Sequence, residues 1–129
     1  MSLVRLIDSY CEAWSEHDEA RRAELLLAVW APGASYTDPT VHVVGASGLL
    51  AHIAEVQARR PGSKVVRTSE VDEHHRVARF AWRAIEAGGN ALPEGIDVAF
   101  VTADGARIER IIGFFGPTKP RQPAPASTT

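Results

Sequence analysis

Asp97 is the residue of this 129-residue chain whose setting points most clearly to chemistry. It lies in the apolar run Ile96–Val101, and side chains along a strand alternate between two faces. Both faces of this run are apolar, so we expect the carboxyl group to have nonpolar neighbours. Desolvation then opposes ionisation, and such a group can serve as a neutral hydrogen-bond donor or as an acid–base with a raised pKa. The structural alternative pairs Asp97 with Arg79 or Arg83, or places it at an exposed strand end.

Two further polar residues suit the same chemistry. Asp38 precedes Pro39 at the end of a predicted strand, where side chains often border the mouth of a cavity. An Asp-Pro step also commonly begins a turn, which is the alternative. Tyr10 lies on the apolar stripe of a predicted helix, and a buried phenol requires a partner for its O–H group. Its alternative role is core packing with a backbone partner.

A cavity beside these polar groups would be lined mainly by aromatic and apolar side chains. The predicted substrate-binding residues are Trp14, His52, Phe80, Trp82, Ala99 and Phe115. Ala99 shares the strand face of Asp97, and His52 flanks the apolar stripe of a predicted helix. Simpler alternatives exist, because inward aromatic residues usually belong to the core and a histidine in this position could equally lie on the surface.

Other kinds of site find little support in the sequence. The adjacent residues His74 and His75 fall in a predicted turn, which favours solvent exposure over metal binding. Cys11 is the only cysteine, so there is no disulfide framework, and no basic residue is expected beside it to generate a thiolate. No phosphate-binding loop, dinucleotide fingerprint or nucleophile elbow occurs. We therefore expect neither a metal ion nor an organic cofactor.

Composition places these residues in a small globular protein. Hydrophobic residues make up 45% of the chain and charged residues 23%, as in ordinary soluble domains. The formal net charge of −2 gives no electrostatic reason to expect nucleic acid binding. No apolar run has the roughly 18–20 residues that a membrane span requires. Arg5 and Asp8 interrupt the apolar N-terminal stretch, so no signal peptide is expected and the predicted location is cytoplasmic.

Three helices are predicted to position the candidate residues. Apolar residues recur at helical spacing over residues 2–16. Asp18 can cap a second helix over Glu19–Val29, which Pro32 and Gly33 would stop. Ser47 can cap a third helix, which ends at the Pro-Gly pair of residues 61–62.

The remainder of the chain is rich in strand patterns separated by turn residues. The predicted strands are Ala34–Thr37, Lys64–Val71, Val77–Glu86, Ile96–Val101 and Arg107–Phe115, with a brief apolar run at Val41–Val44. Predicted turns are Asp72–His75, Gly88–Gly95 and Ala103–Gly105. Helices followed by a meander of strands indicate an α+β protein. Residues 1–116 form one predicted domain, and the Pro-rich segment 117–129 is expected to be a disordered tail.

Five short motifs occur in the order found in one superfamily. They are Ser-Tyr-Cys-Glu-Ala-Trp at 9–14, Tyr-Thr-Asp-Pro at 36–39, Gly-Ile-Asp at 95–97, Ala-Asp-Gly-Ala-Arg-Ile at 103–108 and Gly-Phe-Phe-Gly at 113–116. Over about residues 3–116 the chain resembles the nuclear transport factor 2-like superfamily, in particular its SnoaL-like and ketosteroid isomerase-like branch. The resemblance implies a cone-shaped α+β barrel, with three N-terminal helices packed in the concave face of a curved, mainly antiparallel sheet.

The resemblance also implies roles for the three candidate polar residues. The isomerase pattern has a tyrosine on its first helix, which Tyr10 matches, and a base aspartate before a proline, which Asp38 matches. Its second aspartate, kept protonated in an Ile-Asp step of a late strand, corresponds to Asp97. The chain departs from the pattern at His52 and Ile53, where the isomerases carry aromatic residues, including a tyrosine that supports the oxyanion hole.

The expected function is therefore a small-molecule enzyme of the isomerase or cyclase type, which transfers a proton α to a carbonyl in an apolar pocket. Asp38 would be the base, while Tyr10 and neutral Asp97 would donate hydrogen bonds to the enolate oxygen. In a cyclase, Asp97 itself, with His52, would be the acid–base. Two alternatives stay open: an epoxide hydrolase-like enzyme with an aspartate–arginine arrangement, and a non-catalytic protein that binds a hydrophobic small molecule.

A homodimer is the expected assembly. Ile96, Val98 and Phe100 form one face of a predicted strand, and no predicted helix remains to cover that face. Exposed apolar patches usually mark interfaces, so we expect two copies to associate through the outer face of the sheet.

Overall fold

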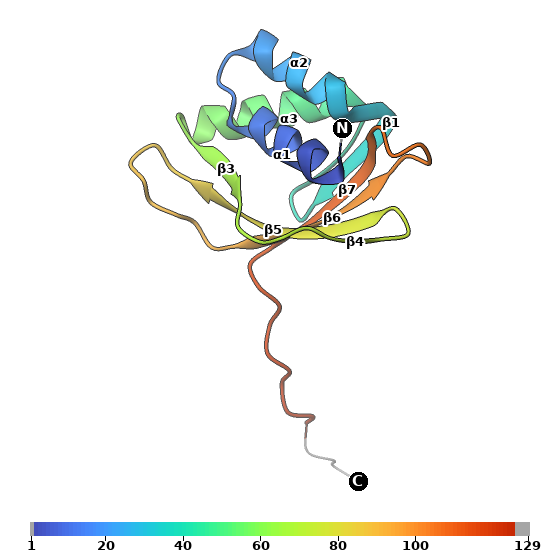
Figure 1. Ribbon diagram of the computed structural model, residues 1–129. Coiled ribbons are helices and arrows are strands. Elements are labelled where there is room, and N and C mark those ends of the chain that lie inside the picture. Colours follow the sequence, from blue (N-terminus) through green and yellow to red (C-terminus); the bar gives the residue numbers. More distant parts are fainter. Residues whose placement is uncertain (1, 126–129) are drawn as a thin grey trace.

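The computed structural model describes residues 2–125. Its helices are α1 (Leu3–Ser15), α2 (Glu19–Val29) and α3 (Ala46–Arg59). Its strands are β1 (Trp30–Asp38), β2 (Val41–Val44), β3 (Lys64–Arg67), β4 (Asp72–His74), β5 (Val77–Ile85), β6 (Gly95–Val101) and β7 (Ile108–Phe115). The helices lie on one side of a single curved sheet, which confirms the predicted α+β class (Figure 1).

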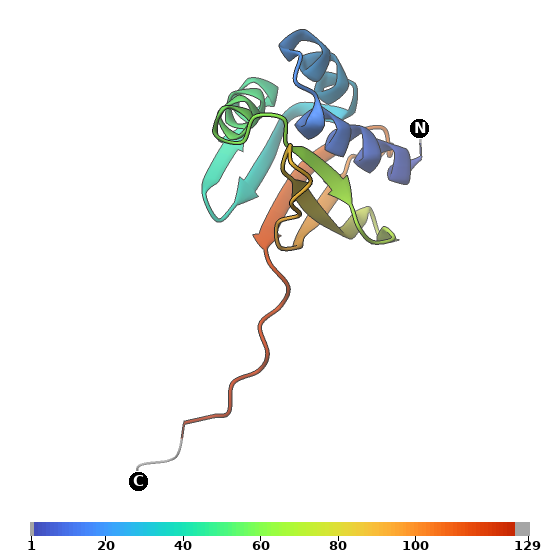
Figure 2. The ribbon, with the colours of Figure 1, turned by 90° about the vertical axis from the view of Figure 1, so that its left-hand side faces the viewer.

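The sheet is mixed but mainly antiparallel, as predicted. Its strand order is β2-β1-β7-β6-β5-β3, and β4 pairs with β5 beside that path. The β1–β7 pair is parallel, while the other strand pairs of the described chain are antiparallel. Within residues 2–125 the end strands β2 and β3 do not pair with each other, so the sheet forms an open cone rather than a closed barrel. Seen after a quarter turn, it curls beneath the helices (Figure 2).

Local side-chain contacts explain where the helices begin. The Ser2 hydroxyl accepts a hydrogen bond from the Arg5 N–H at the start of α1, and the Asp18 carboxylate accepts one from the Arg21 N–H at the start of α2. The predicted cap of the third helix was wrong. Gly45 precedes α3 without any side-chain cap, and Ser47 lies within its first turn.

Two strand boundaries also differ from the prediction. Strand β1 begins at Trp30, directly after α2, and not after Pro32 and Gly33. The pairing of β1 with β7 shifts register between Trp30 and Ser35, and this irregularity accommodates the proline inside a strand. The predicted turn at Asp72–His75 is instead mostly strand β4, because the reversal falls at His75 and Arg76, both with positive φ.

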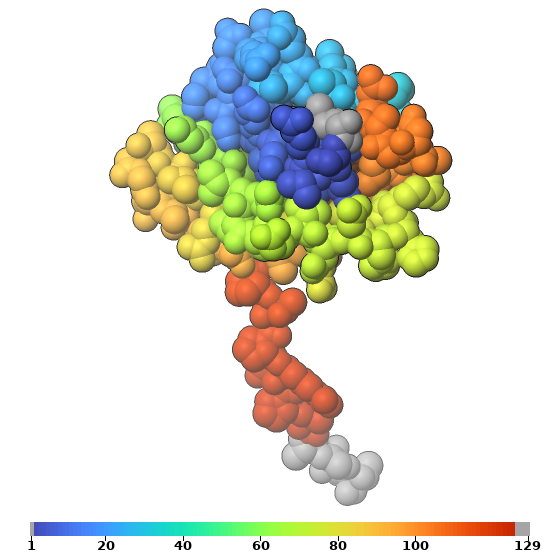
Figure 3. Space-filling model, in the orientation of Figure 1, coloured from blue at the N-terminus to red at the C-terminus, as the bar shows by residue number. Residues whose placement is uncertain are grey.

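The core lies between the helices and the concave face of the sheet. Its largest fully buried side chains are Tyr10, Phe80, Leu6, Ile7, Leu26, Leu49, Ile53, Ile108, Ile111 and Val29. These residues come from all three helices and from β5 and β7, so the helices are fixed to the sheet by apolar burial. The space-filling view shows the N-terminal helices in close contact with the strands below them (Figure 3).

After Gly116 the chain leaves the body of the protein. Residues 117–125 are exposed and form neither helix nor strand, and they extend away from the end of β7 (Figures 1 and 3). The boundary between a domain over 1–116 and a disordered tail over 117–129 stays a prediction, and residues 126–129 lie outside the described part of the chain. None of the described helices is long and apolar enough to cross a membrane.

Candidate active site

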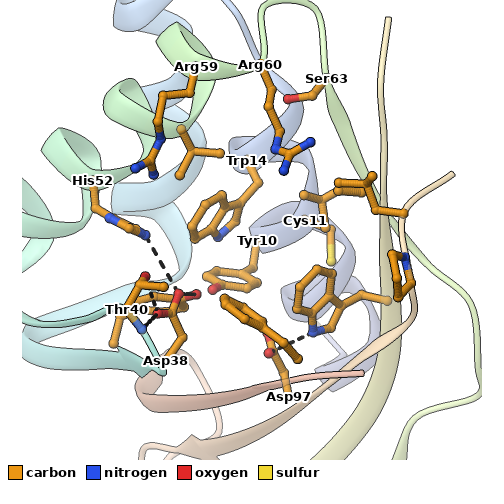
Figure 4. A pocket seen from close by; sticks show the side chains of 18 of the residues that line it. Tyr10, Cys11, Trp14, Asp38, Thr40, His52, Arg59, Arg60, Ser63 and Asp97 are labelled. Carbon is orange, nitrogen blue, oxygen red and sulfur yellow. Dashed lines mark hydrogen bonds and ion pairs between the residues drawn. The ribbon is translucent and has the colours of Figure 1, made fainter. Parts of the chain in front are cut away.

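A cavity of about 660 Å³ opens between the helices and the concave face of the sheet. Its closed end is formed by buried residues, among them Tyr10, Phe80 and Asp97. Its mouth is formed by exposed residues, including Arg59 and Arg60 at the end of α3. Figure 4 shows the two ends, with the carboxyl groups near the sheet and the guanidinium groups near the end of the helix. A cavity of this size suits a small organic ligand.

Asp97 faces this cavity from the middle of β6. Burial alternates along the strand, so Gly95, Asp97, Ala99 and Val101 point inward. The Trp82 indole N–H donates a hydrogen bond to Asp97 Oδ1 over 2.9 Å, and Asp97 Oδ2 has no hydrogen-bond partner among the described residues. Only 5% of the residue is exposed, and this burial, with a smaller contribution from the charge of Asp38, raises the pKa of Asp97 to about 7.

The indole of Trp82 reaches Asp97 because residue 95 is a glycine. A Cβ atom added at Gly95 would fall 2.6 Å from Trp82 Cε2 and 2.8 Å from the Phe114 carbonyl oxygen. The indole therefore lies directly over the backbone of β6, in the space that a side chain would fill. Gly95 positions the donor of the hydrogen bond to Asp97.

Asp38 ends β1 and is held by several donors. Its Oδ1 atom accepts hydrogen bonds from the Thr40 N–H and the Thr40 hydroxyl, both over 2.7 Å. Its Oδ2 atom accepts a hydrogen bond from the Tyr36 hydroxyl over 2.6 Å, and His52 Nε2 lies 3.7 Å from the same oxygen. Its side chain is only 3% exposed. Asp38 therefore both begins a turn, through its hydrogen bonds with Thr40, and lines the cavity. The sequence had left these two roles open as alternatives.

His52 enters the cavity from α3 between two aromatic rings. Its ring centroid lies 5.7 Å from that of Trp14, nearly perpendicular to it, and 5.8 Å from that of Tyr36. The side chain is 7% exposed, so the surface alternative for His52 is wrong. Asp38, His52 and Tyr36 form one polar wall of the cavity.

The two phenols of the site are neutral hydrogen-bond donors. Burial, together with the nearby Asp97, raises the pKa of Tyr10 well above its ordinary value. Burial and the hydrogen bond to Asp38 likewise raise the pKa of Tyr36. The Tyr10 ring stacks on Trp30, with ring centroids 5.9 Å apart and planes 12° from parallel. Tyr10 therefore presents a fixed O–H group at the cavity.

Gly113 of β7 separates the two carboxyl groups. It pairs with Asp97 across the β6–β7 ladder, and β1 runs along the other side of β7. A Cβ atom built at Gly113 would lie 2.8 Å from Asp97 Oδ1 and 3.6 Å from the Asp38 Cβ atom. The floor between Asp38 and Asp97 is therefore bare backbone, because glycine has no side chain to fill it.

Most of the predicted site residues meet at this cavity. Its lining includes Tyr10, Asp38, Asp97, Trp14, His52, Phe80, Trp82 and Phe115. Ala99 was predicted wrongly. It shares the face of Asp97, but it is fully buried in the core, where it pairs with Ala78 and Ile111 in the neighbouring strands.

The alternative in which Asp97 pairs with an arginine is wrong. Arg79 and Arg83 lie on the outer face of β5, where side-chain alternation separates them from the inward Phe80 and its cross-strand partner Asp97. Arg79 forms an ion pair with Asp72 over 3.0 Å. The aspartate–arginine arrangement of an epoxide hydrolase-like site is absent at Asp97 in the described structure.

Several cavity residues were not identified from the sequence. The polar ones are Tyr36, Thr40, Arg59, Arg60, Ser63 and Glu86. Tyr36 lies two residues before Asp38 on the same strand, so alternation alone would have placed both side chains on one face. Arg59 lies seven residues after His52 on α3, which returns it to the same helix face.

Cys11 and the histidine pair of the β4–β5 hairpin are not part of the polar wall of the cavity. Cys11 borders the cavity, but burial raises the pKa of its thiol to about 12, so no thiolate nucleophile is available. His74 and His75 lie on the exposed β4–β5 hairpin, away from the cavity lining. Over the described residues, no three histidine, cysteine or acidic side chains gather in a metal-binding group.

Solved structures resemble this fold over most of its length. A candidate isomerase of the SnoaL-like family from Agrobacterium tumefaciens is 32% identical, with a TM-score of 0.82 over 88% of this chain and 97% of that protein. A candidate polyketide cyclase from Sinorhizobium meliloti is 15% identical, with a TM-score of 0.66 over 84% of this chain and 93% of its own. A nuclear transport factor 2-like protein of unknown function from Exiguobacterium is 18% identical, with a TM-score of 0.66 over 88% and 99% of the two chains. The last two share the fold alone. No protein-family model and no curated protein matches the sequence.

Proposed function

The chain belongs to the SnoaL-like family, within the nuclear transport factor 2-like superfamily, and on that premise we propose that it is a proton-transfer enzyme of the isomerase or cyclase type. Its substrate is a small, mainly apolar carbonyl compound, and the reaction removes a proton from the carbon next to the carbonyl group. The observation that carries this proposal is Asp97, a buried carboxyl group with one free oxygen facing an aromatic cavity.

Asp97 is the proposed acid–base. Its pKa of about 7 means that the carboxylate and the carboxylic acid are both populated near neutrality. A general acid–base works best when its pKa lies near the working pH, because it then both accepts and returns the proton readily. The free Oδ2 atom is available to the substrate, while the hydrogen bond from Trp82 fixes Oδ1.

Asp38 has a supporting role in this proposal, and not the role of base that the resemblance implied. Three hydrogen bonds from Tyr36 and Thr40 already occupy its two oxygens, so a C–H group competes poorly for them. Its carboxylate orients His52 and Tyr36 at the cavity wall and raises the pKa of Asp97. Asp38 is therefore a positioning residue.

The proposed reaction begins when the Asp97 carboxylate takes the proton. The C–H electron pair forms a C=C bond, and the carbonyl π pair moves to oxygen as an enolate. The Tyr10 hydroxyl donates a hydrogen bond to that oxygen, and a donor fixed in advance costs no reorganisation during the step. Isomerisation ends when Asp97 returns the proton to another carbon. Cyclisation ends when the enolate carbon attacks a second carbonyl and Asp97 protonates the new alkoxide.

Hydrogen–deuterium exchange tests the proposal without knowledge of the natural substrate. 2-Tetralone, a bicyclic ketone with acidic α-protons, would be incubated in D₂O with wild-type protein, Asp97→Asn or the surface control Asp72→Asn, and followed by proton NMR. General acid–base catalysis typically contributes about 10²–10⁴-fold in rate. We expect wild type and Asp72→Asn to accelerate exchange and Asp97→Asn to lose about that factor. Equal rates for wild type and Asp97→Asn would contradict the proposal, and bound ketone without acceleration would favour a non-catalytic binding protein.

A homodimer through the outer sheet face stays part of the proposal. Ile96, Val98 and Phe100 are partly exposed there, and Phe114 on the neighbouring strand is 57% exposed. Exposed apolar side chains on one face favour association. Light scattering at micromolar concentration should give twice the chain mass of 14.0 kDa, and a monomer would contradict this assembly.

A further inference from the structure

We infer that the substrate carries an anionic group, such as a carboxylate, which Arg59 binds at the mouth of the cavity while the reacting carbonyl lies at the closed end. This inference rests on the proposed function for the identity of the cavity as the substrate site. It adds a substrate class and a specificity-determining residue that proton transfer alone does not require.

The first observation is the placement of Arg59 on α3. His52, Val56 and Arg59 follow the spacing i, i+4 and i+7, so they share one helix face, and all three line the cavity. Figure 4 shows the Arg59 side chain descending from the end of α3 on the side of the cavity that holds His52. The same helix face thus presents a group at the reacting end and a cation at the mouth.

The second observation is that Arg59 is a cation without an ion-pair partner among the described residues. The neighbouring Arg60 is different, because it forms an ion pair with Glu86 over 3.1 Å, and the Asn90 side chain also donates a hydrogen bond to Glu86. Arg60 and Glu86 therefore balance each other at the mouth. Arg59 supplies the excess positive charge, which remains available to a ligand.

The charges inside the cavity orient such a ligand. The closed end holds Asp38 and Asp97, which repel an anion, while the guanidinium group of Arg59 attracts one. An anionic substrate consequently enters with its charge toward the mouth and its apolar part toward the sheet. This orientation delivers the uncharged carbonyl end to Asp97.

The lining between the two ends of the cavity suits an aromatic ligand. Arg59 follows His52 by seven positions on α3, and the cavity lining includes the aromatic side chains of Trp14, Trp82 and Phe115. Planar aromatic molecules pack favourably on such rings. The inferred substrate class is an aromatic ketone with a carboxylate or a similar anion at its far end.

An arginine at the end of a helix also has a favourable interaction with the helix dipole. That interaction requires only a positive charge near the last turn, and it predicts no preference between ligands. Ligand charge therefore separates the two roles of Arg59 in one experiment.

The test compares two ligands of nearly equal shape, 2-naphthoate and 2-naphthamide, by isothermal titration calorimetry at pH 8. The proteins are wild type, Arg59→Gln, Arg60→Gln and the control Arg83→Gln, which changes an exposed arginine on the outer face of the sheet. A hydrogen bond to a charged group is stronger than one between neutral groups, and exposure to solvent reduces the gain, so we expect wild type to bind naphthoate about tenfold more tightly than naphthamide. Arg59→Gln should bring the two affinities together and leave that of naphthamide unchanged. Arg60→Gln and Arg83→Gln should retain the preference.

Three results would overturn the inference. Wild type could bind naphthoate and naphthamide with equal affinity, Arg59→Gln could lose affinity for both ligands by the same factor, or neither compound could show saturable binding. If Arg60→Gln lost the preference for naphthoate as fully as Arg59→Gln does, that result would also count against the inference. The total charge at the mouth, and not Arg59 itself, would then determine the preference. The Asp97→Asn protein separates this inference from the proposed function. It should keep the preference for naphthoate even though it loses proton transfer, so either claim can fail alone.

Discussion

Asp38 and Asp97 face the same cavity from strands that lie on either side of β7, with the bare backbone of Gly113 between them. Their surroundings differ sharply. Asp38 accepts three hydrogen bonds, whereas Asp97 accepts one and keeps a free oxygen. Two carboxyl groups in one cavity can divide the chemistry when their environments differ in this way. This difference supports the proposal that Asp97 exchanges the proton and that Asp38 positions its neighbours.

The bare floor at Gly113 is expected to be necessary for activity. In Gly113→Ala the new methyl group would fall 2.8 Å from Asp97 Oδ1, so the carboxyl group must move. We expect most of the exchange activity to be lost, with a destabilisation of about 1–3 kcal/mol from overpacking. Urea unfolding and 2-tetralone exchange would measure the two effects. Gly88→Ala is the control, since no atom lies within 4 Å of its added Cβ. Full activity in Gly113→Ala would show that the space above β7 is not used.

The hydrogen bond from Trp82 is expected to tune Asp97. This bond lowers the Asp97 pKa against the effect of burial, so Trp82→Phe should raise that pKa above about 7. The pH at which exchange activity reaches half its plateau should move upward with it, because the carboxylate form is the base. Trp30→Phe is the control for the pH profile, because among the described residues the buried Trp30 indole N–H has no hydrogen-bond partner. Its ring packs on Tyr10, so the pH of half-maximal activity is compared and not the rate itself. An unchanged profile in Trp82→Phe would mean that the bond does not act on the reacting group.

Burial of Asp97 also predicts how stability depends on pH. The ordinary pKa near 3.8 applies to the unfolded chain, and the folded value is about 7. Below the unfolded pKa the group is neutral in both states and its favourable contribution to folding is fully present. Between the two values the unfolded chain loses the proton first, so the free energy of unfolding falls as the pH rises, by up to about 1.4 kcal/mol per pH unit. Above the folded pKa the contribution is lost.

Asp97→Asn carries no titrating proton at this position, so it should lack that decline. The free energy of unfolding of Asp97→Asn minus that of wild type should therefore grow from about pH 4 to about pH 7 and then level off. Urea unfolding of both proteins across this range would measure it. A difference that stays constant with pH would mean that Asp97 titrates alike in the folded and unfolded states.

Local patterns in the sequence were enough for the three helices and for most of the strands, although they missed the start of β1 and the short strand β4. The period-two pattern of Ile96–Val101 put Asp97 on the face opposite Ile96, Val98 and Phe100, and the structure shows that the Asp97 face points inward. The capping residue Asp18 marked the start of α2. The features that were missed depend on pairing between distant strands. Neither the reach of Trp82 to Asp97 nor the position of Gly113 is visible in a local pattern, because both follow from the register of β5, β6 and β7.

The error at Ala99 has the same origin. One face of a strand can line the cavity over part of its length and the core over the rest. The residue at which the cavity ends depends on how the helices pack over the strand. Ala99 lies only two residues beyond Asp97, but its neighbours Ala78 and Ile111 are fully packed. The prediction for His52 agrees better with the structure. Its position beside the apolar stripe of α3 suggested that it could line the cavity, and its buried side chain does so.

The central claim is that Asp97 exchanges a proton near neutral pH, and carboxyl-carbon NMR titration of aspartate-labelled protein tests it most directly. The Asp97 signal would be assigned by its absence from the spectrum of Asp97→Asn and followed from about pH 3 to about pH 9. The account predicts a midpoint of about 7 for this signal. A midpoint at or below the ordinary value of 3.8 would show a permanently ionised carboxylate and would contradict the proposed acid–base role.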